Sequence, residues 1–317
     1  MRFPFDLPRE KEFDAVGFGL NAVDHLVVVP SYPAFDTKMR LSKHVQAAGG
    51  QTATAMAALQ RLGLRAAYAG RFGSDVEGRF GFAAIKDEGV DLEFAEVIEG
   101  ASNQVAFILV DERNGERTVI WDRDERLAYT ADDAPLEIAS RGRVLHLDAH
   151  DPPACARLAL AAREAGAIVS ADIDNIYEGL PELLPLIDVL ISSKEFPHRL
   201  TGIPDAHASL IETKARYGCS IVGMTLGTGG ALIYHDGHFL EAPAFAVPGG
   251  CRDTTGAGDA FHAGFLYGML SGEEIEASLY LANATASLKC RALGARTALP
   301  TRAELTEFLK GNPATLC

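Results

Sequence analysis

Segments of strand character alternate regularly with segments of helical character in the second half of the chain, and this alternation restricts the fold more than any other feature. The strand-like segments are rich in aliphatic residues and occupy 144–147, 168–171, 187–191 and 220–226. The helix-like segments between them occupy 154–165 and 204–217. Strands joined by helical crossovers run in the same direction. We therefore predict an α/β fold with a central, mainly parallel sheet that is covered by helices on both faces.

A second region, in the first half of the chain, is rich in strand formers and lacks helical periodicity. It comprises 92–98, 105–110 and 117–121, and Asn114-Gly115 marks a hairpin turn between the last two. With extended segments near the N-terminus, this region predicts a small β lid formed by about 26–47 and 92–121. No repeat or linker divides the chain, so residues 1–317 are expected to form one domain with the lid inserted in it. Pairing two lids would cover their open edges, so we also expect a homodimer.

The composition limits the possible partners. A net charge of −14 and a pI near 5.1 argue against a nucleic-acid surface, which requires a basic stripe. An anionic substrate must therefore be met by local amides, Lys, Arg or a metal ion. The five cysteines form no C-x-x-C pair, which disfavours a zinc site or a disulfide framework. Without a signal-like or membrane-length apolar run, we expect a cytoplasmic enzyme and no membrane partner.

Familiar nucleotide-binding motifs do not fit this sequence. Gly17-x-Gly19-x-x-Ala22 has the letters of a dinucleotide fingerprint, but that motif requires a helix directly after the glycines. The β-branched segment 26–30 that follows ends in Pro and predicts a strand instead. Neither a G-x-x-x-x-G-K-[ST] loop nor the H-R-D and D-F-G motifs of protein kinases occur.

The stretch 253–261, D-T-T-G-A-G-D-A-F, predicts a loop that runs directly into a helix. Gly256, Ala257 and Gly258 would lie at the helix N-terminus, where unpaired backbone N–H groups and the helix dipole favour an anion. Asp259 would lie in the first turn beside that anion. An ordinary N-terminal Asp stabilised by the dipole is one interpretation. The other is a base that accepts the proton of an alcohol attacking a phosphoryl group.

The complete string resembles the C-terminal signature of the PfkB carbohydrate kinases, the ribokinase-like family. Gly19-x-Asn21-x-x-Asp24 and Gly49-Gly50 resemble two N-terminal motifs of the same family. The resemblance covers roughly 15–300 and implies a ribokinase-like three-layer α/β/α domain with a β-sheet lid. It further implies ATP-dependent transfer of the γ-phosphate to a hydroxyl of a small carbohydrate, with Asp259 as catalytic base and 256–258 as anion hole.

On the sugar side, the resemblance implies that Asp24, Gly49 and Gly50 hold sugar hydroxyls. Thr54 stands where most members have Asn, so the sugar is not expected to be held as ribose is. Leu288-Lys289-Cys290, Gly294-x-Arg296 and Pro300 resemble more weakly a subset that includes sulfofructose kinase and some ketose kinases. In that case Asn103, Arg123 and Arg126, near the β-rich region, could meet an anionic group on the substrate. Solvated lid charges are the alternative.

On the nucleotide side, the resemblance implies a site around the glycine loop that follows the strand 220–226. Its predicted residues are Ser192, Thr225, Gly227, Gly229 and Asn283. The loop could equally be a strand-to-hairpin turn, and Asn283 an ordinary helix-face residue. Glu195 would organise water around Mg²⁺, which gives up its hydration reluctantly. Asp253 stands where many members bind a monovalent cation, but Ala298 offers no hydroxyl there, which leaves activation by K⁺ open.

Three functions follow from these features. A kinase acting on a ketose, sugar acid or related sugar is favoured by Asp24 and the double glycine. A nucleoside kinase would need stacking partners, which the lid offers at Phe35, Phe94, Phe107 and Trp121. A sugar-sensing protein without catalysis is the third possibility, and the intact Asp259 counts against it. The sequence does not identify the sugar, the phosphorylated hydroxyl, or whether the substrate carries phosphate or sulfonate.

Overall fold

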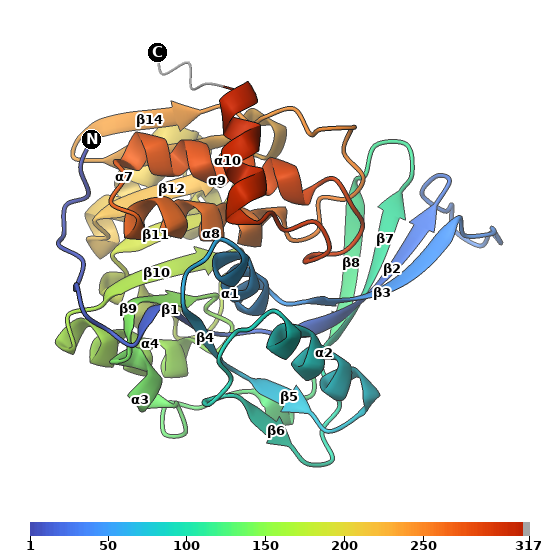
Figure 1. The fold of residues 1–317 in the computed structure, drawn as a ribbon, viewed down its shortest axis with the longest axis horizontal. Helices are drawn as coiled ribbons and strands as arrows, with labels where there is room; N and C mark the ends of the chain where they lie inside the picture. The colour runs from blue at the N-terminus through green and yellow to red at the C-terminus, as the bar shows by residue number, and fades with distance from the viewer. Residues whose placement is uncertain (313–317) are drawn as a thin grey trace.

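An eight-stranded sheet forms the middle layer of the structure (Figure 1), a computed structural model that describes residues 1–312. The strand order is β14-β13-β12-β11-β10-β9-β1-β4, and all neighbours are parallel except the edge hairpin β12-β13-β14. The strands are β1 (Phe13–Phe18), β4 (Ala66–Ala69), β9 (Gly142–Leu147), β10 (Ile168–Ile173), β11 (Val189–Ser193), β12 (Ile221–Thr225), β13 (Ala231–His235) and β14 (His238–Ala242). The predicted mainly parallel sheet is thus confirmed.

Helices cover both faces of this sheet because its strands are apolar on both sides. One face carries α3 (Leu136–Ala139), α4 (Pro152–Glu164), α5 (Leu180–Leu183), α6 (Phe196–Thr201) and α7 (Ala206–Tyr217). The other carries α1 (Gln51–Arg61), α2 (Val76–Asp87), α8 (Ala257–Leu270) and α9 (Ile275–Lys289). The last helix, α10 (Arg302–Gly311), packs on α9. Short 3₁₀ turns occupy η1 (Glu125–Leu127), η2 (Leu184–Leu186) and η3 (Gly227–Gly229).

Local sequence signals explain several helix boundaries. The carboxylate of Asp205 accepts the N–H of Ala208 and caps α7, and Gly218 ends that helix in the left-handed conformation. Pro152 begins α4, where a missing N–H costs no hydrogen bond. Thr301 and Glu304 form a reciprocal capping box at the start of α10. These signals fix the connections that bring the strand ends to one edge.

A separate four-stranded sheet projects from the main body and forms the lid (Figure 1). Its order is β3-β2-β7-β8, made of β2 (Ala22–Val29), β3 (Lys43–Gly49), β7 (Val105–Asp111) and β8 (Arg117–Asp122). Residues of one face, including Leu26, Ile108 and Val110, form a small buried cluster. Alternate residues point to the other face, where Phe107 and Ile120 remain half exposed.

One predicted detail of this region is wrong. The segment 92–98 does not join the lid, because β6 (Glu96–Ile98) pairs with β5 (Arg71–Gly73) in a separate two-stranded sheet. Asp24 lies within β2, between β3 and β7. Among the residues that the structure describes, no helix combines the length and apolar character needed to cross a membrane.

Candidate active site

A cleft of about 910 Å³ lies where the lid meets the carboxyl ends of the parallel strands. The strand ends contribute Asp172 from β10, Ser193 from β11 and Thr225 from β12. The lid contributes polar and apolar side chains of one face, namely Asp24, Ala106, Ile108, Arg117, Val119 and Trp121. Open α/β sheets bind ligands at this edge, where the loops after the strands diverge. The cleft is therefore the candidate active site.

The N-terminus of α8 opens into this cleft, as the sequence predicts. Gly256 precedes the helix with φ 79°, and a Cβ atom there would lie 2.8 Å from Cα of Ala295, so only glycine fits. The N–H of Ala257 donates to the carbonyl of Thr254 at 3.1 Å. Within residues 1–312, the amides of Gly256, Gly258 and Asp259 have no hydrogen-bond partner. These three amides are thus free to bind an anion.

Asp259 lies in the first turn of α8 and lines the cleft. Burial raises the pKa of its carboxyl well above the ordinary value, the neighbouring Asp172 raises it further, and Arg117 opposes both. A carboxylate with a raised pKa binds a proton more tightly than a solvated one. The environment therefore makes Asp259 a better base than an ordinary aspartate.

Asp24 supplies a second buried carboxylate from the lid. Burial raises its pKa to about 6, Arg296 opposes this shift, and Asp253 adds to it. A Cβ atom on Gly49 would lie 2.2 Å from Oδ2 of Asp24, so Gly49 makes room for the carboxylate and does not itself line the cleft. Gly50 does line the cleft, but the backbone conformation, and not access for the substrate, requires glycine at this position. Its φ is 91°, and its Cβ atom would lie 2.4 Å from Cα of Asn21.

Several polar residues of the cleft escaped the sequence analysis. Gln104 is buried, and its Oε1 has no hydrogen-bond partner within the described chain. Arg117 reaches from β8 to the loop before α8 and donates to Oγ1 of Thr254 at 2.5 Å. The two-residue alternation along β8 places residues 117, 119 and 121 on one face, and this period could have identified Arg117. Nothing in the sequence marks Gln104.

Besides Gly49, three more residues predicted to bind substrate lie outside the cleft. Thr54 is buried in α1 and accepts a hydrogen bond from Nε of Arg296 at 3.3 Å. The amide of Asn103 is engaged at both ends by backbone, with Oδ1 accepting from Gly73 and Nδ2 donating to the carbonyl of Gln104. Direct contact of either with a substrate is not supported.

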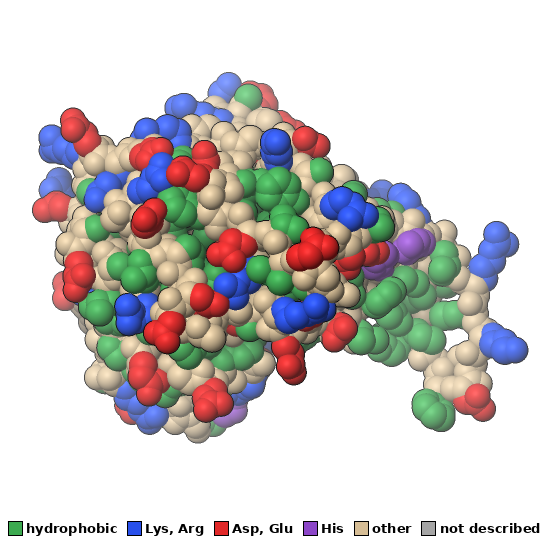
Figure 2. All heavy atoms as spheres, turned by 90° about the horizontal axis from the view of Figure 1, so that it is seen from below, with side chains coloured by type: hydrophobic (Ala, Val, Ile, Leu, Met, Phe, Trp, Pro, Cys, Tyr) green, Lys and Arg blue, Asp and Glu red, His purple; other side chains and the backbone are tan. Residues whose placement is uncertain are grey.

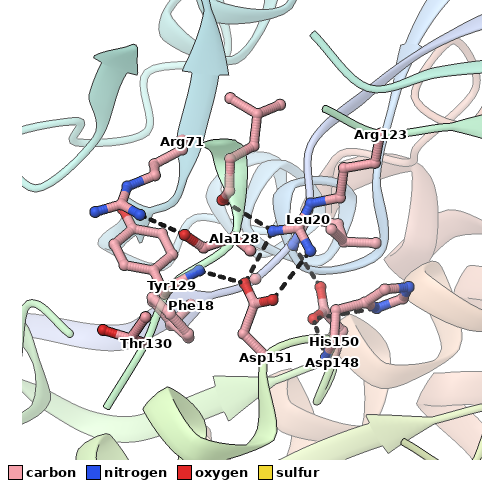
Figure 3. A network of polar contacts seen from close by, with 12 residues as sticks. Phe18, Leu20, Arg71, Arg123, Ala128, Tyr129, Thr130, Asp148, His150 and Asp151 are labelled. Carbon is pink, nitrogen blue, oxygen red and sulfur yellow. Dashed lines mark hydrogen bonds and ion pairs between the residues drawn. The ribbon is translucent and has the colours of Figure 1, made fainter. Parts of the chain in front are cut away.

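Arg123 is the third of these residues, and its guanidinium is already occupied (Figure 3). It donates to both carboxylate oxygens of Asp151, at 3.1 and 2.8 Å, and to the carbonyl of Leu127 at 3.0 Å. Arg126, the other Arg considered there, pairs with Asp124. The lid arginine that faces the cleft is Arg117, so the expectation of an anion-binding Arg moves to that residue.

The side of the cleft that was predicted to bind the nucleotide is formed by the turn after β12 and by α9. Its residues include Thr225, Gly227, Thr228, Gly230, residues 244–247, Asn283 and Ser287. Of the predicted residues, Thr225, Gly227 and Asn283 line the cleft. Gly229 lies outside it, and Ser192 is buried with its hydroxyl donating to the carbonyl of Gly223 at 3.3 Å. Ser193 takes the place expected for Ser192.

Asp172 and Asp174 place two carboxylates in the cleft at the end of β10. Both line the cleft, Nε2 of His262 lies 3.2 Å from Oδ1 of Asp172, and burial together with Asp172 raises the pKa of Asp174. Glu195 lies exposed at the start of α6, outside the lining residues. No cluster of three potential metal ligands occurs in residues 1–312. This donor set fits Mg²⁺ held mainly by phosphate oxygens and water.

Comparisons with known proteins agree with this geometry. The family described as pfkB family carbohydrate kinase matches residues 15–302. An ATP-dependent ribose-1-phosphate kinase of Halopiger xanaduensis is 30% identical over 291 residues, which are 89% of this chain and 93% of that protein. A nucleoside kinase of Methanothermobacter thermautotrophicus is 26% identical, over 92% of this chain and 94% of that protein. The structure of Arabidopsis thaliana ribokinase complexed with ribose and ATP is similar with a TM-score of 0.80, at 25% identity, covering 94% of this chain and 99% of that one.

Proposed function

Since the chain belongs to the pfkB family of carbohydrate kinases, we propose that its cleft transfers the γ-phosphate of ATP to a hydroxyl of a small carbohydrate. The observation that carries this proposal is the position of Asp259. Its carboxyl lies in the first turn of α8, next to amides without partners and in the same cleft as Asp24. A proton acceptor beside an anion site is what attack by an alcohol on a phosphoryl group requires.

In the proposed reaction, one sugar hydroxyl lies between Asp259 and the γ-phosphate. Its oxygen bonds to the γ-phosphorus while the bond from phosphorus to the bridging oxygen of ATP breaks, and ADP leaves. Asp259 takes the hydroxyl proton, which its raised pKa favours. The amides of Gly256 and Gly258 donate to the oxygens of the transferring group and stabilise their charge. Mg²⁺, bound with ATP, would neutralise further phosphate charge near Asp172 and Asp174.

The other sugar hydroxyls are assigned to the lid side of the cleft. Asp24 accepts hydrogen bonds, and the unpartnered Oε1 of Gln104 can accept another. Arg117 adds a guanidinium to the same space, which suits a sugar that carries a phosphate or sulfonate. The ribose-1-phosphate kinase relative supports including sugar phosphates among the candidates.

A nucleoside kinase is the second candidate, and Trp121 is the observation that favours it. Of the four aromatic lid residues that the sequence offered, Trp121 lines the cleft, where its indole could stack on a base. The nucleoside kinase relative supports keeping this class. A Trp121→Ala variant separates the two candidates, because it should weaken the binding of a nucleoside, which has an aromatic base, much more than the binding of a sugar, which has none.

The experiment that tests the proposal is ADP formation with MgATP across a panel of compounds. The panel contains ketoses, aldoses, sugar acids, sugar phosphates, sulfofructose and nucleosides. Turnover with a sugar or sugar phosphate supports the proposal, and turnover with nucleosides alone supports the second candidate. If no compound in the panel led to ADP formation while a sugar still raised the thermal unfolding midpoint, a non-catalytic sugar sensor would replace both kinase candidates.

A further inference from the structure

Asp253 and Lys289 form a fully buried ion pair directly behind the anion site. Nζ of Lys289 lies 3.9 Å from Oδ2 of Asp253 and donates to the backbone carbonyl of Asp253 at 3.0 Å. Oδ1 of Asp253 accepts from N–H and Oγ1 of Thr255, at 2.8 and 2.7 Å, and Oδ2 accepts from N–H of Gly294 at 2.8 Å. Three chain segments therefore meet at one carboxylate: the end of α9, the loop before α8, and the loop at Gly294.

Burying this lysine has a cost that needs an explanation. Desolvating an ammonium group is unfavourable by several kcal/mol, and an apolar pair of similar volume is often as stable as a buried ion pair. Lys289 nevertheless has none of its side chain exposed. Its position as the last residue of α9 helps, because the C-terminal end of a helix favours a positive charge. The pair is thus retained for something other than stability alone.

The residues around Asp253 do not fit the monovalent ion expected there. A carboxylate oxygen and a backbone carbonyl are suitable ligands for such an ion, but the ammonium of Lys289 already contacts both groups of Asp253. A second cation on this carboxylate would lie close to that ammonium and be repelled by it. The remaining acceptor sites of the carboxylate are taken by Thr255 and Gly294.

We propose that Lys289 is a built-in monovalent cation, which takes the place of K⁺ and positions the anion site, so that catalysis does not require an added monovalent ion. This inference rests on the proposed kinase function and assigns a positioning role to a residue that touches neither substrate. The ammonium is a compact point charge on a tether, which is the same electrostatic element that a bound ion would provide.

The pair is connected to both halves of the reaction. Asp253 orients Thr255, the next residue is Gly256, and the free amides of Gly258 and Asp259 follow in the first turn of α8. On the other side, Gly294 leads to Arg296, whose Nη2 donates to the carbonyl of Gly49 at 2.5 Å. Loss of the ammonium should therefore disturb the anion site first, and the sugar side through Arg296.

The test compares the wild-type protein with Lys289→Ala and Lys289→Met, with Lys310→Ala as control. Lys310 also lies in the last turn of a helix, but it is exposed and pairs with Glu307. Initial rates are measured in K⁺, Na⁺, NH₄⁺ and choline chloride at equal ionic strength. Wild type and Lys310→Ala should have the same kcat in all four salts. Lys289→Ala should lose kcat by about 100-fold, with a smaller change in KM for the sugar.

Chemical rescue distinguishes a missing cation from a damaged fold. Lys289→Ala leaves space beside Asp253, so K⁺ or NH₄⁺ should restore part of its kcat, whereas Lys289→Met fills the space and should not respond. The thermal unfolding midpoint provides a readout without turnover: K⁺ should raise it for Lys289→Ala and leave it unchanged for wild type, relative to choline. This readout remains decisive even if no compound in the panel is phosphorylated, so failure of the kinase proposal is recognised separately.

Three outcomes would overturn the inference. One is activation of the wild-type protein by K⁺ over choline. Another is a Lys289→Ala variant that keeps wild-type kcat in choline. The third is a Lys289→Ala variant whose kcat and unfolding midpoint are both indifferent to K⁺ and NH₄⁺. If neither Lys289 variant folds, the salt dependence of the wild-type rate and unfolding midpoint still decides the question.

Discussion

Asp259 differs from its neighbours in that its two chemical requirements conflict. In the proposed reaction it lies beside the transferring phosphate, and it must hold a proton at the end of the step. The α8 N-terminus favours its ionised form, and burial with Asp172 favours its protonated form. Replacing Asp259 with Asn removes the proton acceptor and keeps the shape. We expect kcat to fall by about 1,000-fold, within the range of general-base catalysis, while ATP binding persists.

The measurement for Asp259→Asn is kcat for the best panel substrate, with ATP affinity from calorimetry. Asp87→Asn, at an exposed position near the end of α2, is the matched control and should behave as wild type. A variant at 259 that retained most of its kcat would show that the proton leaves by another route.

Asp24 gives a prediction about pH. The hydroxyl-accepting form is the ionised one, so KM for the sugar should rise as the pH falls through about 6, the pKa of Asp24. Asp24→Asn should raise KM by about 10- to 100-fold and flatten this dependence. Asp122→Asn, exposed on the same lid, is the control. If the dependence of KM on pH near 6 persisted in Asp24→Asn, a group other than Asp24 would cause it.

Replacing the carboxyl of Asp24 with a neutral amide should also stabilise the folded protein at neutral pH. Its pKa is about 6 in the folded protein against 3.8 ordinarily, so the folded form binds more protons than the unfolded chain between these values. The stabilisation that the protonated Asp24 gives the folded protein is full below pH 3.8 and is lost as the pH rises through about 6. At neutral pH, Asp24→Asn should therefore unfold at a higher temperature than wild type, by up to about 3 kcal/mol in free energy. Destabilisation at neutral pH would contradict this sign.

At the scale of the element, the lid strand β8 is joined to the loop before α8 by a hydrogen bond. Arg117 donates to Thr254, in the loop that leads to the amides proposed to bind phosphate. Arg117→Gln should loosen this closure, lower kcat by about 10-fold, and raise the ratio of ATP hydrolysis to sugar phosphorylation, since water is excluded less well. Arg113→Gln, exposed near the β7–β8 turn and paired with Asp111, is the control. If the ratio of ATP hydrolysis to sugar phosphorylation did not change, Arg117 would have no role in closing the lid.

A helix or strand was predictable where the spacing of its apolar residues reflects which of its sides are buried. The strand and helix periods of 144–226 predicted β9 to β12 and the helices α4 and α7, because buried parallel strands and amphipathic helices have distinct patterns. The segment 92–98 was assigned to the wrong sheet, because strand formers do not specify which strand they pair with. Likewise, a carboxylate 28 residues away decides what Arg123 does, and its spacing in the sequence gives no sign of that contact. Asp259 and Asp24 were identified through motifs and not through periodicity.

At the scale of the whole molecule, the lid presents apolar side chains on a face away from the main body. Figure 2 shows hydrophobic side chains gathered on this projection. Phe107 and Ile120 are 50% and 59% exposed, and β3 and β8 have unpaired edges within the described chain. We propose that a second copy of the protein covers this face and one of these edges, which gives a homodimer.

Sedimentation velocity at micromolar concentration tests the dimer. Wild type should sediment as twice the 33.8 kDa chain, and Ile120→Lys should shift it to the monomer, because it places a charge within the proposed apolar contact. Ile211→Lys, on α7 and 44% exposed, changes a similar residue on the main body and should leave the dimer intact. A wild-type monomer at these concentrations would remove the proposal.

The strand order of the main sheet also has a consequence for synthesis of the chain. β1 lies between β4 and β9, and Phe13 pairs with Gly142, which follows the entire lid in the sequence. During synthesis, nearly half of the polypeptide must be made before β9, the second neighbour of β1, exists. Until then β1 keeps an apolar edge open, and this is the period in which a nascent chain is most exposed to aggregation and most dependent on chaperones. A lid that is inserted early in the chain therefore delays closure of the sheet from which it projects.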